Sequence, residues 1–171
     1  GEALLLLPLP IGISFYTFHG ISLVIDSWRG KVPGAVSSPP MVHGRNTLLY
    51  ITFFPQLIAG PIVKAQDFMP QIASKRFGDI DWQAARRRLI LGFFLKTVIA
   101  DNLAQQTTYM SCPTCSSLSS LDLVALLIGY SAQIFADFFG YSLIAMGLAA
   151  LLGYRLPVNF DRPYISESVA E

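Results

Sequence analysis

One acidic side chain lies in the middle of the longest apolar stretch of the sequence. Residues 123–154 form a run of 32 residues in which Asp137 is the one charged group. An ionisable group at the centre of a bilayer costs about 2.5–3.5 kcal/mol on insertion scales, and such groups usually face a cavity or a polar partner. Asp137 is therefore the first candidate for a functional acid in a wet conduit. The alternative is a structural hydrogen-bond network that locks two helices together.

Polar side chains accompany this aspartate at the spacing of a helix. Four of them recur every three or four residues, which places them on one helical face: Tyr130, Gln133, Asp137 and Tyr141. Ser142 follows directly, and Gly140 allows another backbone to approach closely. The pattern predicts one polar stripe along an otherwise apolar helix.

Histidines and cysteines are the remaining candidates for chemistry. His19 lies within an apolar stretch, where a neutral ring hydrogen-bonded between helices is preferred over a catalytic base. His43 lies in a loop rich in proline and glycine, where no catalytic role is expected. Cys112 and Cys115 have the spacing of a redox pair without its usual strand and helix, so a local disulfide is the alternative. No metal site is predicted from these dispersed residues.

The composition predicts what must position these groups. Of 171 residues, 53% are hydrophobic and 13% are charged, whereas soluble domains carry about 25% charged residues. Mean hydropathy is +0.50. We therefore predict an all-α integral membrane protein, a multi-helix transmembrane bundle. The net charge of +1 and the placement of basic residues in loops argue against a nucleic-acid partner.

Apolar runs and turn signals divide the chain into three predicted spans, at about 10–28, 89–108 and 121–154. The first helix is expected to start near Pro10, because proline suits a first turn. The run at 123–154 would be about 48 Å long as a straight helix, so it must tilt, bend near Gly140 or form two helices. Lys96 interrupts the second span and can either snorkel to the interface or meet an acid inside.

Segment 46–63 is apolar but interrupted. Its flanking loops carry three basic residues before it and six after it, and 102–121 carries none. The positive-inside rule places both flanking loops in the cytoplasm and 102–121 outside, so 46–63 is predicted to dip into the membrane and return.

Pro55 removes a helical hydrogen bond, and Gly60 with Pro61 permits a reversal. Backbone groups freed there must be buried in protein or face water, and Gln56 is one local partner. A crossing helix with a proline kink is the alternative. Loop 64–88 is then cytoplasmic and ends in an interfacial helix start at residues 82–88, WQAARRR, which acts as a topology anchor. Residues 155–171 begin a cytoplasmic or interfacial segment.

Three stretches together resemble one known family. They are PIGISFYTF at 10–18, FFPQLIAGP at 53–61 with DF at 67–68 and PQ at 70–71, and DFFGYS at 137–142 with Ala145, Gly147, Leu148, Asn159, Phe160 and RPY at 162–164. VIADNL at 98–103 is similar too. The set resembles the membrane-bound O-acyltransferase (MBOAT) family, in the branch of the alginate O-acetylation protein, over nearly the whole chain. One departure is Leu143, where the alginate-type pattern often has aspartate, which weakens alginate as the substrate more than acyl transfer as the activity.

The resemblance implies part of a larger MBOAT fold in a multi-pass enzyme of the bacterial inner membrane. Such an enzyme would move acyl groups, most often acetyl, from a cytoplasmic donor such as acetyl-CoA through a tunnel toward an extracytoplasmic polysaccharide, by way of a periplasmic partner protein. No bound cofactor is expected. In relatives the catalytic histidine lies in a stretch rich in tryptophan and arginine that would follow Glu171. Relatives carry a second functional histidine further along the chain. His19 and His43 match neither this histidine nor the catalytic one, so the chain by itself is expected to be inactive.

On this interpretation the chain contributes tunnel-lining residues. They are Gln133, Asp137, Tyr141, Ser142 and Asn159, and, from the interrupted segment, Pro55, Gln56, Gly60 and Pro61. Two other classes of protein fit the same features. A transporter or channel also uses broken segments and a mid-membrane acid. A membrane scaffold without catalytic activity is the other alternative. The sequence following residue 171 would distinguish them.

Overall fold

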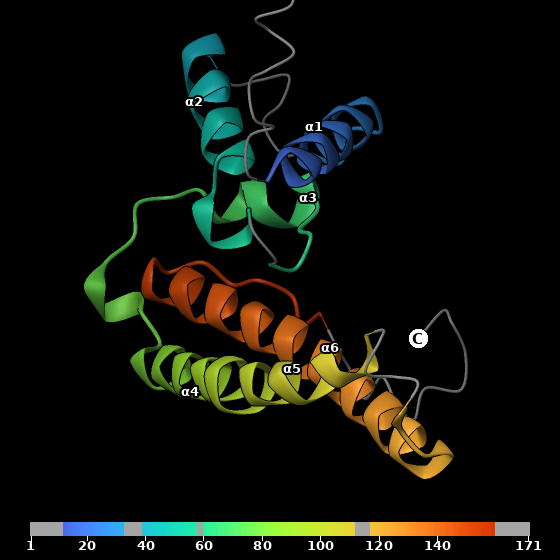
Figure 1. The fold of residues 1–171 in the computed structure, drawn as a ribbon. Coiled ribbons are helices and arrows are strands. Elements are labelled where there is room, and N and C mark those ends of the chain that lie inside the picture. Colours follow the sequence, from blue (N-terminus) through green and yellow to red (C-terminus); the bar gives the residue numbers. More distant parts are fainter. Residues whose placement is uncertain (1–11, 33–38, 58–59, 112–116, 160–171) are drawn as a thin grey trace, which may run out of the picture.

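The computed structural model describes residues 12–32, 39–57, 60–111 and 117–159, and it consists of helices and turns, with no strand in these ranges. The described ranges contain six α-helices: α1 (Ile13–Trp28), α2 (Pro40–Ile51), α3 (Ala65–Phe68), α4 (Trp82–Phe93), α5 (Asp101–Thr107) and α6 (Ser120–Leu151). Helices α1 to α3 form a lobe at one end of α6, and α4 and α5 run along α6 as an antiparallel layer (Figure 1).

A π-helical segment, Phe94–Ala100, joins α4 to α5, so that residues 82–107 form one rod. The rod begins at Trp82, which confirms the helix start expected there, and residues 82–88 are therefore helical rather than loop. Asp81 caps this start, since its carboxylate accepts a hydrogen bond from the Ala84 amide at 2.9 Å. Helix α1 begins at Ile13, slightly later than expected, because Gly12 precedes it in a left-handed conformation.

Helix α6 is continuous through Gly140, so of the three arrangements considered for this run it does not divide into two helices. It is the one helix in the described ranges whose length and composition would let it cross a membrane. A reciprocal capping box starts it, in which Asp122 N–H bonds the Ser119 hydroxyl and Ser119 N–H bonds the Asp122 carboxylate.

The C-terminal end of α6 turns the chain back on itself. Gly153 takes φ +77°, and the Tyr154 amide donates to the Ala149 carbonyl at 2.9 Å, which is the Schellman termination. The chain after Gly153 therefore runs back along α6 (Figure 1). Gln71 fastens this returning segment, because its side-chain amide bonds both the N–H and the carbonyl of Arg155.

Helices α4 and α6 touch at their backbones. Gly92 and Gly140 face each other and are both buried. A Cβ added to Gly92 would lie 2.8 Å from the Gly140 carbonyl oxygen, and one added to Gly140 would lie 3.0 Å from the Gly92 oxygen. Small residues at such a crossing are typical of helices that pack in membranes, where close backbone approach supplies the attraction.

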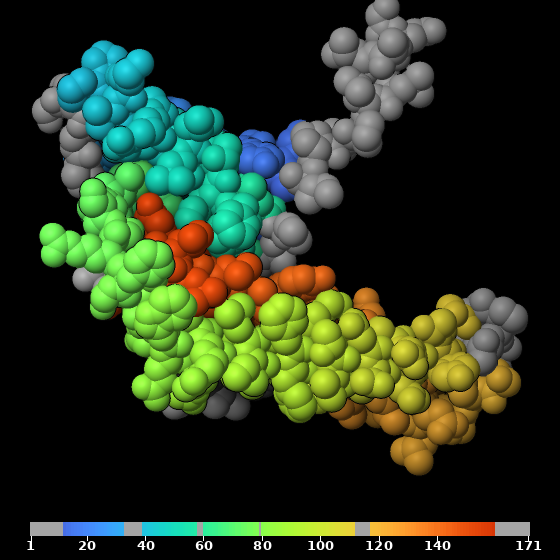
Figure 2. Space-filling view, turned by 90° about the vertical axis from the view of Figure 1, so that its left-hand side faces the viewer, coloured from blue at the N-terminus to red at the C-terminus, as the bar shows by residue number. Residues whose placement is uncertain are grey.

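Aromatic side chains join the lobe to the C-terminal half of α6. Phe68 stacks on Tyr154 with ring centroids 5.1 Å apart, and Phe53 contacts Phe68 edge-on at 4.9 Å. The same buried cluster includes Leu143, Met146 and Ala149 of α6. The N-terminal part of α6 and α5 extend beyond this lobe (Figure 2).

Replacing Tyr50 with phenylalanine is expected to destabilise the lobe. The Tyr50 side chain is fully buried and its hydroxyl donates to the Val63 carbonyl at 2.7 Å. Tyr50→Phe leaves that buried carbonyl unpaired, which costs about 1–3 kcal/mol. The lower midpoint of thermal unfolding of the full-length protein in detergent would measure it. Tyr109→Phe, at an exposed tyrosine, is the matched control, and equal midpoints for the two variants would contradict the expectation.

Candidate functional site

Asp137 forms an ion pair across the helical layer. The Lys96 ammonium lies 2.7 Å from a carboxylate oxygen of Asp137 on α6 and 2.7 Å from a carboxylate oxygen of Asp101. Of the two possibilities left open for Lys96, the structure shows contact with acids. The group holds two carboxylates and one ammonium, so it carries a formal charge of −1 within an apolar layer.

The π-helical segment explains why Asp101 joins this pair. Lys96 and Asp101 are five residues apart, which on an α-helix would separate their directions by about 140°. A π-helix closes its hydrogen bonds from i to i+5, so residues five apart lie on one face. The 3.6-residue period of an α-helix does not place Lys96 and Asp101 on one face. Sequence analysis based on that period therefore missed Asp101.

Two other residues of the polar stripe, Gln133 and Tyr141, share the face of α6 that carries Asp137, and this face meets the rod. The Lys96 ammonium lies 5.3 Å from the centroid of the Tyr141 ring, a cation–π distance. Gln133 accepts a hydrogen bond from the Thr107 hydroxyl of α5. Gln133, Asp137 and Tyr141 thus line the contact between α6 and the segment 94–107, whereas Tyr130 is 46% exposed.

Ser142 lies on a different face of α6 from Asp137, since five α-helical residues turn through about 140°. Its side chain is fully buried and bonds the Asn159 side-chain amide at 3.2 Å. Asn159 belongs to the segment that returns after α6. This contact joins two predicted site residues to each other, away from the ion pair.

The interrupted segment forms a compact turn beside the lobe. Helix α2 ends at Ile51, and a 3-10 turn, Phe54–Gln56, follows. All four predicted residues there are buried: Pro55, Gln56, Gly60 and Pro61. A Cβ at Gly60 would lie 2.6 Å from the Gln56 Cα, so the chain folds back on itself at this point. Within the described part, α2 does not continue past Pro55 as a kinked helix would.

Gln56 acts as the local partner expected of it. Its amide nitrogen donates to the Tyr50 carbonyl near the end of α2 at 3.4 Å, and its amide oxygen has no hydrogen-bond partner among the described residues. No contact joins Gln56 to Asp137 within the described ranges. The predicted residues therefore fall into separate groups around α6, rather than into one cluster.

The direction of segment 46–63 can be tested by labelling. In a background with Cys112 and Cys115 replaced by serine, Gly44→Cys and Gln66→Cys are expected to react with an impermeant thiol reagent from the same side of the membrane if the segment dips in and returns, as the loop charges predict. Thr108→Cys, in the stretch predicted outside, should react from the opposite side. Reaction of positions 44 and 66 from opposite sides would show a crossing segment.

His19 differs from expectation. The side chain is buried as predicted, but neither ring nitrogen has a hydrogen-bond partner among the described residues. The ring instead lies against Tyr50, with centroids 5.1 Å apart. The hydrogen-bonded interpretation is therefore not what the described residues show. The cysteine pair and the motif residues beyond Asn159 lie outside the described residues.

Asp26 is a buried acid that the sequence reasoning missed. Its carboxylate accepts from the Ser22 hydroxyl at 3.1 Å and from the Gln66 amide at 3.4 Å, and Ser22 accepts from the Ala65 amide. These bonds satisfy the first amides of α3 and tie α3 to α1. Ser22 and Asp26 have the i, i+4 spacing of one helical face. This spacing is the signal in the sequence that could have indicated the Asp26 site.

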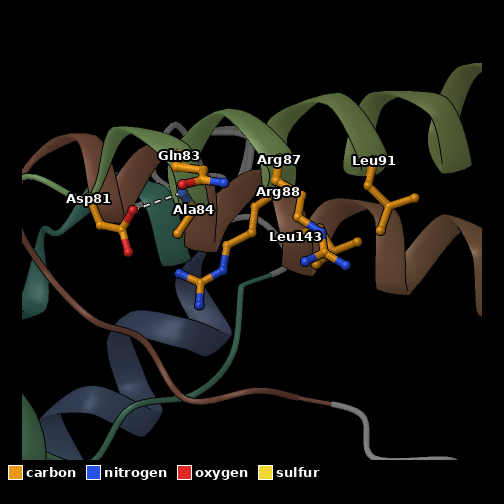
Figure 3. A pocket seen from close by; sticks show the side chains of 7 residues that line it. All are labelled: Asp81, Gln83, Ala84, Arg87, Arg88, Leu91 and Leu143. Atoms are coloured by element: carbon orange, nitrogen blue, oxygen red, sulfur yellow. Dashed lines mark hydrogen bonds between the residues drawn. The ribbon is translucent and has the colours of Figure 1, made fainter.

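A hollow opens beside the start of α4. Its volume is about 440 Å³, and Figure 3 shows the seven side chains that line it: Asp81, Gln83, Ala84, Arg87, Arg88, Leu91 and Leu143. Asp81 lies at one end and Leu91 at the other. The three arginines at 86–88 were interpreted as a topology anchor, and the structure places two of them in this hollow. Within the described ranges, no group of three or more His, Cys, Asp or Glu side chains could hold a metal ion.

Comparison with known proteins gives consistent relationships. Residues 13–170 match the family model described as the membrane-bound O-acyltransferase family, MBOAT. The chain is 36% identical to the probable alginate O-acetylase AlgI of Azotobacter vinelandii over 95% of this chain and 31% of that protein. It is 33% identical to a peptidoglycan O-acetyltransferase of Helicobacter pylori over 91% and 33% of the two chains. It is 27% identical to a teichoic acid D-alanyltransferase of Bacillus subtilis over 94% and 40%. The chain thus spans about a third of the length of these curated relatives.

Proposed function

Because the chain belongs to the membrane-bound O-acyltransferase family, we propose that it is part of a membrane enzyme that transfers acyl groups to a polymer of the cell envelope. The match over residues 13–170 is the observation that carries this proposal. The printed names of the relatives share acyl transfer, and they differ in the polymer: alginate, peptidoglycan or teichoic acid. Acetyl is the acyl group in two of these three.

We further propose the route of transfer. The donor is cytoplasmic, with acetyl-CoA as the candidate, and the acceptor is an extracytoplasmic polysaccharide reached through a partner protein. The basic loops before and after segment 46–63 support a cytoplasmic position for that end of the molecule under the positive-inside rule. The protein is then a multi-pass protein of the bacterial inner membrane.

In this proposal the described residues hold the acyl path rather than perform the chemistry, which belongs to a histidine elsewhere in the full-length protein. Asp137, Lys96 and Tyr141 place charged and polarisable groups side by side in an apolar layer. Such a group favours water and polar acyl carriers over lipid along that face. Ser142 and Asn159 hold the returning segment against α6 on another face.

Membrane vesicles that contain the full-length protein and its extracytoplasmic partner test the proposal. With radiolabelled acetyl-CoA on the cytoplasmic face and alginate on the other, we expect labelled ester on the polymer that mild alkali releases. Vesicles without the protein are the control. Labelled material that accumulates inside the vesicles without ester formation would instead favour transport, and exchange of alginate for peptidoglycan or teichoic acid would identify the polymer.

A further inference from the structure

The first turns of α4 carry a cluster of positive charge that has no ion-pair partner among the described residues. Arg86, Arg87 and Arg88 are consecutive, and none of them has a carboxylate within ion-pair distance among the described residues, where the ion pairs belong to Lys96. The nearby Asp81 carboxylate is engaged in capping the Ala84 amide. Three adjacent guanidinium groups give this end of α4 a positive potential, so an anion bound next to them would be stabilised.

These charges lie at one end of a groove along α4. A hollow of about 530 Å³ is lined by Gln83, Arg86, Arg87, Ile90, Leu91 and Phe94. It adjoins the hollow in Figure 3, with which it shares Gln83, Arg87 and Leu91. The groove therefore reaches from the surface of α4 toward Leu143 of α6, and both guanidinium groups drawn in Figure 3 lie on this side of α4.

The groove changes character along the helix axis. Its arginines occupy the first two turns, and its other end is formed by apolar side chains that remain open: Ile90 is 64% exposed, Leu91 42% and Phe94 48%. From Arg87 to Phe94 the helix rises about 10 Å. A ligand that fits must join an anionic group to an apolar chain over that length. A phospholipid has this form, with its phosphate next to its acyl chains.

We propose that this groove binds an anionic phospholipid, with its phosphate between Arg87 and Arg88 and an acyl chain along Ile90, Leu91 and Phe94. Basic pockets between helices on the cytoplasmic side of membrane proteins bind such headgroups. The predicted placement of loop 64–88 in the cytoplasm puts the arginines at that boundary. The headgroup would lie in the hollow that Leu143 of α6 also lines, and the acyl chain would cover the open face formed by Ile90, Leu91 and Phe94.

Lipid binding by the full-length protein tests the site. The protein is purified in detergent, titrated with phosphatidylglycerol or phosphatidylcholine, and the bound lipid is counted by native mass spectrometry. We expect Arg87→Gln to weaken phosphatidylglycerol binding about fivefold and Arg87→Gln with Arg88→Gln about twenty-five-fold, since each basic residue near an anionic surface contributes about 1 kcal/mol. Arg45→Gln removes the same charge from an exposed position on α2 and should leave binding unchanged.

Two further arms separate a lipid from a soluble phosphate. Ile90→Asn keeps every charge but makes the apolar end polar, so it should weaken phosphatidylglycerol binding, and millimolar inorganic phosphate should not displace the lipid. Displacement by phosphate, together with normal binding by Ile90→Asn, would show a site for a soluble anion and overturn the proposal. Equal losses for Arg87→Gln and Arg45→Gln would overturn it as well, because only general surface charge would then be at work. A thermal unfolding midpoint near that of the unmodified protein confirms that each variant is folded.

Discussion

The full-length protein with Asp137→Asn is expected to lose at least nine-tenths of its acyl transfer while remaining inserted and folded. Removing one partner of a buried ion pair costs about 3–5 kcal/mol. The side chains of Lys96 and Asp137 keep 25% and 42% exposure, so we take about half of that cost. About 2 kcal/mol lost from the aligned state would slow transfer more than tenfold. The rate of ester formation in the vesicle assay measures the effect.

Asp101→Asn is the matched control for this prediction. It removes the other carboxylate that bonds the same ammonium, but Asp101 is more exposed, at 51%, and belongs to the same rod as Lys96. An exposed pair contributes about 0.2–1 kcal/mol, so we expect transfer to fall no more than about fivefold. If both variants lost activity equally, transfer would depend on the number of carboxylates that balance the charge of Lys96, and not on Asp137 itself. Full activity of Asp137→Asn would reduce that residue to packing.

Of the substitutions proposed here, Gly140→Leu is expected to give the largest loss of stability. A Cβ at this position would lie 3.0 Å from the backbone oxygen of Gly92 and 3.1 Å from the backbone nitrogen of Lys96. Backbone atoms cannot rotate away as the end of a side chain can. The helices would have to separate, which typically costs about 1–3 kcal/mol or more. Separation would also lengthen the Lys96–Asp137 pair, which lies one turn away. The midpoint of thermal unfolding, followed by fluorescence-detected gel filtration, should fall sharply.

Gly129→Leu provides the comparison on the same helix. No atom lies within 4 Å of a Cβ built at Gly129, and leucine is the better helix former by about 0.8 kcal/mol. Its midpoint should therefore stay level or rise. Similar losses at positions 129 and 140 would mean that hydrophobic bulk anywhere on α6 is harmful, and that close backbone contact with α4 is not the cause.

Local patterns in the sequence predicted local features of the structure well. The 3.6-residue spacing placed Gln133, Asp137 and Tyr141 on one face of α6, and Pro55 with Gly60 indicated the break after α2. Trp82 marked the start of α4. Each of these depends on residues within a few turns of one another, where spacing and propensity decide the outcome.

Features that join distant segments were not predictable in the same way. Whether the Lys96 ammonium reaches solvent or an acid depends on which face of the rod meets α6. The sequence of the rod alone does not determine that face. The bonds from Asp26 to the start of α3 join residues 40 positions apart. His19 was expected to bond a neighbouring helix, yet its environment is set by the Tyr50 ring of α2. Pairing of segments, and not the pattern within any one of them, determines these contacts.

The π-helical segment gives the rod a tolerance of the loss of one residue that a uniform helix would lack. Each π ring encloses one residue more than an α ring, so the deletion of a single residue between Phe94 and Ala100 could be absorbed as continuous α-helix. In a uniform α-helix the same deletion would turn every following side chain by about 100° around the axis, whereas here only the extra residue of the π ring is lost and the side chains from Asp101 onward keep their direction relative to α4. The glycine contact would survive this change, and after a deletion between Lys96 and Asp101 the two residues would have the i, i+4 spacing of one α-helical face. One codon lost in this stretch thus leaves the charges of the two helices facing each other, whereas one codon lost from α4 would rotate the rest of the rod.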